Sequence, residues 1–309
     1  MTAAPWPDGF LTAMLTPLSG DELDVPRIKY AVERQVSAGV DGIVIAGGTG
    51  EFGALSLEER KLLATASIDA AAGRIPVVVQ TGALASRDCY TLSEHAQALG
   101  ALGLLVTAPF GEPLNWPEKV HFYEGLARRV DLPIMIYNTP AAGLLSFEQV
   151  QELAAIPNVS AIKDSAGDMA LLGDLSSWSS SARFQVYVGI DSLLWEGIAG
   201  GARGAIFGTG NVIPELLSAL TNNLLAEEAS ASDLDRWRAV RRFMRYMERT
   251  SNYVSFCKAG ARAAGFDVGD VRDPYLMPDA SESELLRQRI HALRDELASI
   301  SAGSQSTST

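Results

Sequence analysis

Lys163 stands where a buried strand is expected to end. The segment Val159–Lys163 reads as a short apolar strand, and side chains along a strand alternate between its two faces. Lys163 therefore shares a face with the small Ala161. Burying an ammonium group is costly, so a lysine at the end of such a strand indicates a function. The alternative is a lysine that turns into solvent and pairs with Asp164 or Asp168.

A desolvated lysine is a nucleophile. Burial removes the hydration of the ammonium group and so favours the free amine. The free amine attacks a ketone to form an imine. The protonated imine is an electron sink, which permits carbon–carbon cleavage, condensation or loss of water beside a 2-oxo acid without a metal or another cofactor. Of the five lysines in the chain, only Lys163 ends an expected internal strand. We therefore predict that Lys163 is catalytic and that the protein needs no cofactor.

Tyr137 ends the preceding expected strand, Pro133–Tyr137. If these two strands are neighbours, the phenol and the Lys163 amine lie at adjacent strand ends. A phenol there can move a proton to and from the carbinolamine and the substrate oxygen. A tyrosine alone at a strand end is more often an amphipathic rim residue, but the paired lysine favours an acid/base role.

A glycine-rich turn, Ala46-Gly-Gly-Thr-Gly-Glu51, follows the second expected strand. Such a turn before a helix presents free backbone N–H groups, and the Thr49 hydroxyl adds a donor, so a carboxylate can bind. The turn lacks both the GK[ST] ending of a phosphate-binding loop and the GxGxxG spacing. The alternative is that its glycines serve only the geometry of the turn.

These residues need a scaffold that brings several strand ends together. Eight short β-rich runs are expected to be strands: Phe10–Leu15, Gly42–Ala46, Pro76–Gln80, Gly103–Thr107, Pro133–Tyr137, Val159–Lys163, Phe184–Gly189 and Gly204–Gly208. Helical patterns alternate with them, among them Pro26–Ala38, Leu57–Ala72, Arg87–Leu99, Pro117–Val130 and Ser146–Ala155. Repeated β-then-α units predict an α/β protein with a (β/α)8 barrel, whose active site lies at the C-terminal ends of the strands.

Three segments are expected along the chain. Residues 1–212 form the barrel, and residues 213–300 form a C-terminal helical extension. The expected helices of the extension lie near Pro214–Ala226, Ser232–Tyr253, Val254–Ala264 and Ser281–Ile300. Residues 301–309 have too little apolar content to pack and are expected to form a disordered tail.

The composition disfavours several classes of function. The formal net charge of -12 repels phosphate backbones and anionic lipids, so neither nucleic acid nor a membrane is expected as a partner. The arginine-rich segment 236–249 also carries acidic and apolar residues, as a solvated amphipathic helix does. Two cysteines and three histidines are scattered, which indicates neither a disulfide framework nor a metal site. No basic leader or membrane-spanning run is evident, so a cytoplasmic enzyme is expected.

Six short motifs occur in order on the expected strands: Leu15-Thr16-Pro17, Gly48-Thr49-Gly50-Glu51, Tyr137-Asn138 with Pro140, Ile162-Lys163-Asp164, Gly204-Ala205-Ile206 and Asn211-Val212-Ile213-Pro214. With them, the chain from about residue 10 to residue 274 resembles the dihydrodipicolinate synthase / N-acetylneuraminate lyase family of Schiff-base aldolases. The resemblance implies a small-molecule 2-oxo acid substrate such as pyruvate and a homo-oligomer, either a dimer or a tetramer.

The resemblance also implies roles for individual residues. Lys163 forms the imine and Tyr137 is the acid/base. Gly48 and Thr49 hold the substrate carboxylate, and Ile206 lines the pocket beside the imine. A further candidate substrate contact is Gly189, at the end of the seventh expected strand.

Three departures from the family pattern disfavour a biosynthetic role. The synthases carry a second hydroxyl residue in the loop, a tyrosine after strand four and an arginine after strand five, where this chain has Gly48, Gly111 and Ala142. Without that arginine, the carboxylate of aspartate semialdehyde has no cation in the loop, and a buried unpaired carboxylate is costly. We therefore expect keto-deoxy sugar acids, or 2-oxo acids with a neutral polar or aromatic tail, as substrates.

Two carboxylates are candidate contacts for the substrate tail. Asp191 follows the seventh expected strand and Glu112 follows the fourth, so both could accept hydrogen bonds from substrate hydroxyls. The alternatives, which are favoured for either residue alone, are an N-cap for a helix beginning near Leu193 and a solvated loop carboxylate.

Three functions are compatible with the sequence. The first is a Schiff-base lyase or aldolase that cleaves or dehydrates a 2-oxo acid, for example a 2-keto-3-deoxy sugar acid. The second is a 4-hydroxy-tetrahydrodipicolinate synthase, which Ala142 disfavours. The third is a non-catalytic 2-oxo acid sensor, which the retention of Lys163 disfavours.

Overall fold

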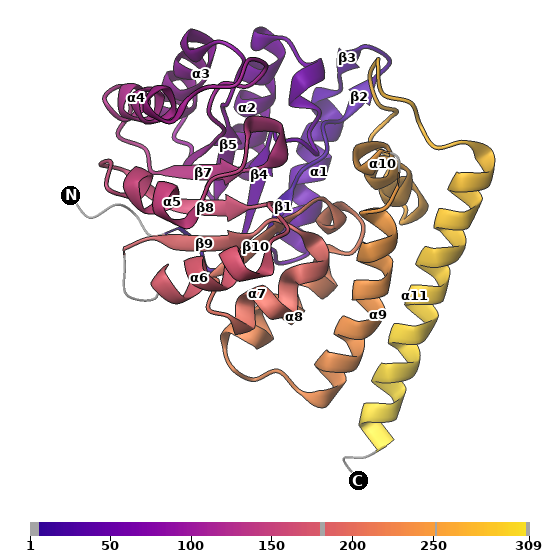
Figure 1. Cartoon of the computed structure of the whole chain (residues 1–309). Coiled ribbons are helices and arrows are strands. Elements are labelled where there is room, and N and C mark those ends of the chain that lie inside the picture. Colours follow the sequence, from indigo (N-terminus) through magenta and orange to yellow (C-terminus); the bar gives the residue numbers. More distant parts are fainter. Residues whose placement is uncertain (1–5, 180–182, 251, 307–309) are drawn as a thin grey trace.

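The computed structural model of the chain describes residues 6–179, 183–250 and 252–306. Residues 1–5 and 180–182 of the expected barrel, residue 251 of the extension and residues 307–309 of the expected tail lie outside the described residues. The described chain forms a closed barrel of eight parallel strands with helices around it (Figure 1). The predicted α/β fold class is confirmed.

All eight expected strands are present, each within two residues of its predicted bounds. They are β1 (Gly9–Ala13), β4 (Gly42–Ile45), β5 (Val77–Gln80), β6 (Gly103–Val106), β7 (Ile134–Asn138), β8 (Val159–Asp164), β9 (Gln185–Val188) and β10 (Gly204–Phe207). They pair in the order β1-β10-β9-β8-β7-β6-β5-β4, and β4 pairs with β1 to close the barrel. A small antiparallel hairpin, β2 (Leu18–Ser19) with β3 (Glu22–Leu23), lies after β1.

The strands read as nearly continuous apolar runs because they are buried on both faces. One set of side chains packs inside the barrel, including Val78, Leu105 and Met135, while the other set packs under the surrounding helices. Trp6 joins the inner cluster before β1 begins, and its Nε1 donates to Ser160 Oγ at 2.9 Å near the start of β8. Trp6 therefore closes the N-terminal end of the barrel, which leaves the opposite end open for a site.

Eight helices follow the eight strands. They are α1 (Val25–Ser37), α2 (Leu57–Ala71), α3 (Ser86–Ala98), α4 (Trp116–Ala127), α5 (Phe147–Ala154), α6 (Met169–Ser179), α7 (Leu194–Ala199) and α8 (Pro214–Leu225). Capping boxes begin α2, α4 and α5, in which a Ser or Asn side chain and a Glu or Gln three residues later exchange hydrogen bonds with the backbone. These caps account for the sequence positions at which the helices begin.

The eighth helix corrects the predicted domain boundary. We expected the extension to begin at residue 213, but α8 packs against β1 and completes the eighth β/α unit. Its Ser218 hydroxyl donates to the Gly39 carbonyl at 2.7 Å, in the turn that follows α1. The barrel therefore continues through α8. The helical spacing of apolar residues is the same in a barrel helix and in the helices that follow it, so this spacing could not give the boundary.

The extension consists of α9 (Ala231–Met247), α10 (Tyr253–Ala263) and α11 (Ala280–Ser306). α9 and α11 lie side by side along one flank of the barrel (Figure 1). The arginine-rich helix α9 is amphipathic as predicted, with Trp237, Val240, Phe243 and Met244 buried. In the part of the chain that the structure describes, no helix combines the length and apolar character needed to cross a membrane.

The end of α11 differs from the predicted tail. The helix continues through residues 301–306, where we expected disorder from residue 301 onward. The Ser301 hydroxyl donates to the Leu297 carbonyl at 3.0 Å, one turn earlier. Extending a helix that has already formed adds one hydrogen bond per ordered residue, so its last turns do not need an apolar face of their own.

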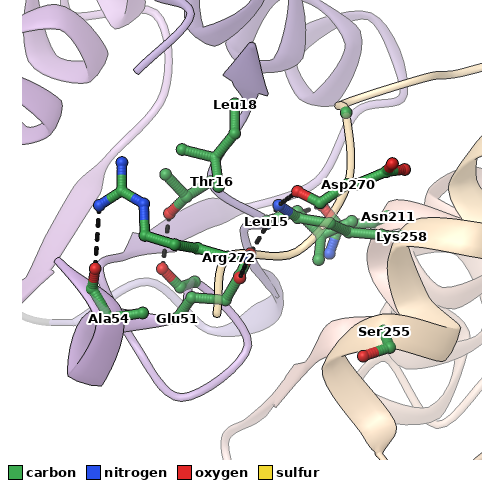
Figure 2. A network of polar contacts seen from close by, with 12 residues as sticks. Leu15, Thr16, Leu18, Glu51, Ala54, Asn211, Ser255, Lys258, Asp270 and Arg272 are labelled. Carbon is green, nitrogen blue, oxygen red and sulfur yellow. Dashed lines mark hydrogen bonds and ion pairs between the residues drawn. The ribbon is translucent and has the colours of Figure 1, made fainter. Parts of the chain in front are cut away.

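A buried ion pair joins the extension to the barrel (Figure 2). Lys258 Nζ of α10 lies 2.6 Å from Glu51 Oε1 in the loop after β4, and both side chains are fully buried. Lys258 also donates to the Asp270 carbonyl at 2.8 Å, and the backbone N–H of Arg272 donates to Glu51 Oε2 at 3.0 Å. Burial lowers the pKa of the Lys258 ammonium, and the Glu51 carboxylate opposes that shift. Each charge therefore depends on the other for its burial.

Replacing Lys258 with Met should lower the free energy of unfolding by about 3–5 kcal/mol, because the Glu51 carboxylate would remain buried without its cation. Denaturant unfolding measures the effect. The matched control in the same helix is Arg262→Met, whose cation pairs with Asp267 and Asp270 at the surface and whose loss should cost about 1 kcal/mol or less. Equal losses for the two variants would show that the buried pair does not anchor α10.

Candidate active site

A cavity of about 570 Å³ opens at the C-terminal ends of the strands. Seven of the eight predicted site residues line it: Gly48, Thr49, Tyr137, Lys163, Gly189, Asp191 and Ile206. They come from four strand ends and from the loop after β4, so the closed barrel brings together residues that are up to 158 positions apart in the sequence. Glu112 is not among the described residues that line the cavity and lies exposed in the loop after β6.

Lys163 is buried, with 6% of its surface exposed, and it shares the inner face of β8 with Ala161. Its backbone pairs with Tyr137 of β7 on one side and with Tyr187 of β9 on the other. The ammonium nitrogen lies 4.7 Å from the centre of the Tyr137 ring. The sequence placed this lysine correctly because strand alternation and the barrel rule act together.

The two carboxylates that could have paired with Lys163 are engaged elsewhere. Asp164 accepts from Asn138 Nδ2 at 2.7 Å, and burial raises the pKa of this carboxyl group. Asp168 accepts from the backbone N–H groups of Ala170 and Leu171 at the start of α6. Among the described residues, Lys163 forms no ion pair, which removes the solvent-exposed alternative for this lysine.

Tyr137 lies between Lys163 and the glycine-rich loop. A Cβ atom at Gly48 would lie 3.8 Å from the Tyr137 hydroxyl, so this loop residue adjoins the phenol. Gly48 has no hydroxyl with which to relay a proton to the phenol. The space beside Tyr137 is therefore left to substrate or solvent.

The glycine-rich loop is fixed by contacts on both sides. The Thr16 hydroxyl donates to the Gly50 carbonyl at 2.6 Å, and the loop ends at Glu51, which the Lys258 ion pair holds (Figure 2). On the cavity side, a Cβ atom at Gly208 would lie 2.9 Å from Thr49 Cγ2 and 2.7 Å from the Tyr253 ring. Thr49 and Tyr253 therefore meet over Gly208, where only a glycine leaves room for both.

Asp191 is buried and does not cap the following helix, contrary to the alternative favoured by its sequence position. Its Oδ2 accepts hydrogen bonds from the Thr209 hydroxyl at 2.6 Å, the Tyr253 hydroxyl at 2.7 Å and the Thr209 N–H at 3.4 Å. Burial raises the pKa of Asp191 to about 6, against the hydrogen bonds from Thr209 and Tyr253, which lower it. This carboxyl group therefore changes its protonation state near pH 6.

Three polar cavity residues come from the extension, together with the apolar Val254, and they were not predicted from the sequence. Arg245 and Glu248 lie at the end of α9, and Tyr253 begins α10. Glu248 accepts from the backbone N–H and the hydroxyl of Ser192, each at 2.8 Å, and from Arg245 at 3.0 Å. The sequence carries no local signal for these roles, because long-range packing alone brings α9 and α10 over the mouth of the barrel.

Arg245 changes the electrostatic expectation for the cavity. The loop after β7 has Ala142 where the family pattern has an arginine. The guanidinium of Arg245, on α9, lines the same cavity from another direction. Arg245 Nη1 lies 3.0 Å from Glu248 Oε2, so the two charges form an ion pair, and nearly half of the Arg245 side chain is exposed. The cavity therefore contains a cation at its mouth in addition to Lys163.

The comparisons with known proteins agree with this geometry. A model of the dihydrodipicolinate synthetase family matches residues 7–293. A 4-hydroxy-tetrahydrodipicolinate synthase from Hyphomonas neptunium is 31% identical over 294 residues, which cover 90% of this chain and 95% of that protein. An uncharacterized DapA-like lyase from Halobacterium salinarum is 33% identical over 273 residues, which cover 86% of this chain and 87% of that protein.

Two solved structures are similar over nearly the whole chain. The prophage protein YagE from E. coli K12, solved in complex with pyruvate, superposes with a TM-score of 0.85 at 28% identity, covering 93% of this chain and 98% of that one. A dihydrodipicolinate synthase from Acinetobacter baumannii, also complexed with pyruvate, gives a TM-score of 0.86 at 28% identity with the same coverage. The likeness therefore includes the barrel and most of the extension.

Proposed function

This chain is a lyase that belongs to the dihydrodipicolinate synthetase family, and from that premise we propose that it forms a Schiff base with a 2-oxo acid and cleaves or dehydrates it. The observation that carries the proposal is the buried Lys163, which has no ion-pair partner in the described part of the chain and shares one cavity with Tyr137 and Thr49. Two similar proteins, YagE and the Acinetobacter baumannii synthase, were solved with pyruvate, which supports a pyruvate-type acid as the part of the substrate beside the lysine.

Each residue has a chemical task in this proposal. The Lys163 amine attacks C2 of the substrate, and loss of water gives an iminium that withdraws electrons from C3. Tyr137 supplies and removes the protons of the carbinolamine step. The Gly48–Thr49 segment receives the carboxylate through its N–H groups and the Thr49 hydroxyl. Ile206 packs beside the imine and keeps this part of the cavity apolar.

The substrate is larger than pyruvate in this proposal. The cavity holds about 570 Å³, and beyond Lys163 it is lined by polar groups, among them Asp191, Ser192 and Glu248. Carboxylate and hydroxyl groups accept and donate hydrogen bonds to sugar hydroxyls. A 2-keto-3-deoxy sugar acid fits this combination of an apolar imine site and a polar tail site.

A second candidate is the condensation of pyruvate with aspartate semialdehyde. Arg245 favours it, because this guanidinium could pair with the semialdehyde carboxylate in place of the absent loop arginine. The 31% identity to a 4-hydroxy-tetrahydrodipicolinate synthase points the same way. Against it, Arg245 is already paired with Glu248, and Gly48 and Gly111 leave no hydroxyl relay beside Tyr137.

Pyruvate with borohydride should leave a covalent adduct on Lys163, because reduction fixes an imine that otherwise hydrolyses. Peptide mass spectrometry locates the adduct. The Lys163→Met variant is the control and should take up no label, while Lys258 and the surface lysines stay unmodified in both proteins. Absence of label on Lys163 at saturating pyruvate would contradict the proposal.

Replacing Tyr137 with Phe should lower kcat roughly 10²–10⁴-fold, the usual range for a lost acid/base group. The fold should persist, since only a hydroxyl is removed. Steady-state kinetics measure the loss, and Tyr30→Phe, at a largely exposed tyrosine of α1, should behave like the parent. Unchanged turnover by the Tyr137 variant would assign the proton transfer to another group.

A keto-deoxy sugar acid should be turned over with a higher kcat/KM than pyruvate plus aspartate semialdehyde. The reason is that Lys163 is used for the imine, and Arg245, the other cation among the described residues that line the cavity, is already paired with Glu248. Parallel steady-state assays of the parent and the Arg245→Met variant decide between the two candidates. Efficient condensation that is lost in Arg245→Met would establish the synthase reaction and overturn the preferred one.

A further inference from the structure

We propose that a groove between α9 and α11 binds a small polyanion, a molecule that carries at least two phosphate or carboxylate groups. The groove is lined by six arginines and one tyrosine, and we call it the arginine groove: Arg238, Arg241, Arg242, Arg245, Tyr246, Arg249 and Arg289. The proposal goes beyond the catalytic reaction and does not depend on it.

The sequence gathers these arginines on one side of α9. Arg238, Arg242 and Arg245 recur at intervals of four and three residues, which returns a side chain to the same face of a helix. Trp237 and Phe243 lie on the other face and are buried. The amphipathic helix predicted from the sequence is therefore present, and its exposed side gathers positive charge.

Arg289 reaches the arginine groove from α11, which lies beside α9 (Figure 1). Its guanidinium carbon lies 5.5 Å from the centre of the Tyr246 ring. The groove encloses about 530 Å³, within the range of roughly 300–1,000 Å³ that is usual for small-molecule sites. Glu282 of α11 lies near Tyr246, but no acidic side chain is among the described residues that line the groove. The groove therefore has the size of a ligand site and a positively charged wall.

The carboxylates that pair with these arginines do not neutralise all of them. Four pairs are formed, each with one carboxylate from outside the lining: Arg238 with Asp235, Arg241 with Glu196, Arg242 with Glu296, and Arg245 with Glu248. Arg249 and Arg289 are exposed and form no ion pair within the described residues. Six guanidinium groups thus have four carboxylate partners, which leaves two positive charges available to a ligand.

Solvation of α9 does not explain this arrangement. Like charges four residues apart on a helix repel each other, and both Arg238–Arg242 and Arg241–Arg245 have this spacing. The groove also opposes the formal net charge of the chain, which is -12. A bound anion relieves the repulsion. Exposed ion pairs are weak, so the paired guanidinium groups can turn toward the anion at little cost.

The chemistry of the guanidinium group indicates the class of ligand. Its N–H groups form paired hydrogen bonds with two oxygens of a phosphate or a carboxylate. The two cations without a partner match two anionic groups. From Arg238 to Arg249 the chain rises only about 16 Å at the helical 1.5 Å per residue. A nucleic acid would extend beyond this length over an acidic protein that repels its phosphates, so a small molecule is the better match.

The arginine groove adjoins the catalytic cavity, and Arg245 lines both. Arg241 Nε donates to the Ser192 carbonyl at 3.0 Å, in the turn after β9. Glu248, the partner of Arg245, accepts from the N–H and the hydroxyl of the same serine. A ligand in the groove therefore meets two arginines that are linked to one turn at the mouth of the catalytic cavity.

Isothermal titration calorimetry of the whole chain tests the proposal with two probes, inorganic pyrophosphate and citrate, which distinguish phosphate from carboxylate groups. The double variant Arg249→Gln/Arg289→Gln removes the two arginines that have no ion-pair partner, so no carboxylate loses its cation. We expect the parent to bind at least one probe and the double variant to bind it roughly 10²-fold more weakly, about tenfold for each charged hydrogen-bond donor lost. Each single variant should weaken binding about tenfold.

The control Arg287→Gln/Arg294→Gln removes the same charge from α11, at two arginines that helical geometry turns away from Arg289. It should bind like the parent at an ionic strength of about 0.1 M, where charges more than about 10 Å apart are largely screened. Lys163→Met should also bind like the parent, which separates the arginine groove from the catalytic cavity and this proposal from the proposed function.

Three results would overturn the proposal. The first is that the parent binds neither probe. The second is that Arg249→Gln/Arg289→Gln binds as tightly as the parent, or no more weakly than the Arg287→Gln/Arg294→Gln control. The third is that Lys163→Met loses the binding, which would place the probe in the catalytic cavity.

Discussion

Closure of the parallel barrel is the constraint on which the site depends. Pairing of β7 with β8 in the register Tyr137 to Lys163 places the phenol and amine at the same height, and pairing of β8 with β9 brings the Asp191 turn to the other side. Because strand side chains alternate, a slip of one residue would turn Lys163 out of the barrel. The apolar layers beneath, including Ala161 and Met135, therefore determine the register and with it the direction of the amine.

The extension completes a site that the barrel alone leaves open. α9 contributes Glu248 and Arg245, and α10 contributes Tyr253, all at the mouth of the cavity. The Lys258–Glu51 pair joins α10 directly to the loop that is proposed to bind the carboxylate. In the proposed function, substrate recognition is therefore coupled to the docking of the extension. This explains why a buried ion pair occurs at this place, where two apolar residues would be the simpler solution.

Much of this arrangement could be predicted from the sequence, for reasons particular to each residue. The eight strands are short apolar runs bounded by turn residues, and Lys163 and Tyr137 each end one of them, so strand alternation and the barrel rule bring them together. Gly48 and Thr49 were predicted because a glycine-rich turn before a helix presents free N–H groups and because the turn belongs to a motif of the family. Asp191 was assigned correctly to the cavity, but the helix-cap alternative was wrong, because its partners Thr209 and Tyr253 are 18 and 62 residues away.

Tyr253, Arg245 and Glu248 could not be predicted, since each lies in an ordinary amphipathic helix and only tertiary packing turns it toward the cavity.

The most direct test of the account is a crystal structure of the protein soaked with pyruvate. The account predicts a covalent bond between Lys163 Nζ and C2 of pyruvate, with the carboxylate on the Gly48–Thr49 segment and Tyr137 and Asp191 on either side. Pyruvate bound without a covalent bond, or attached to another lysine, would contradict it.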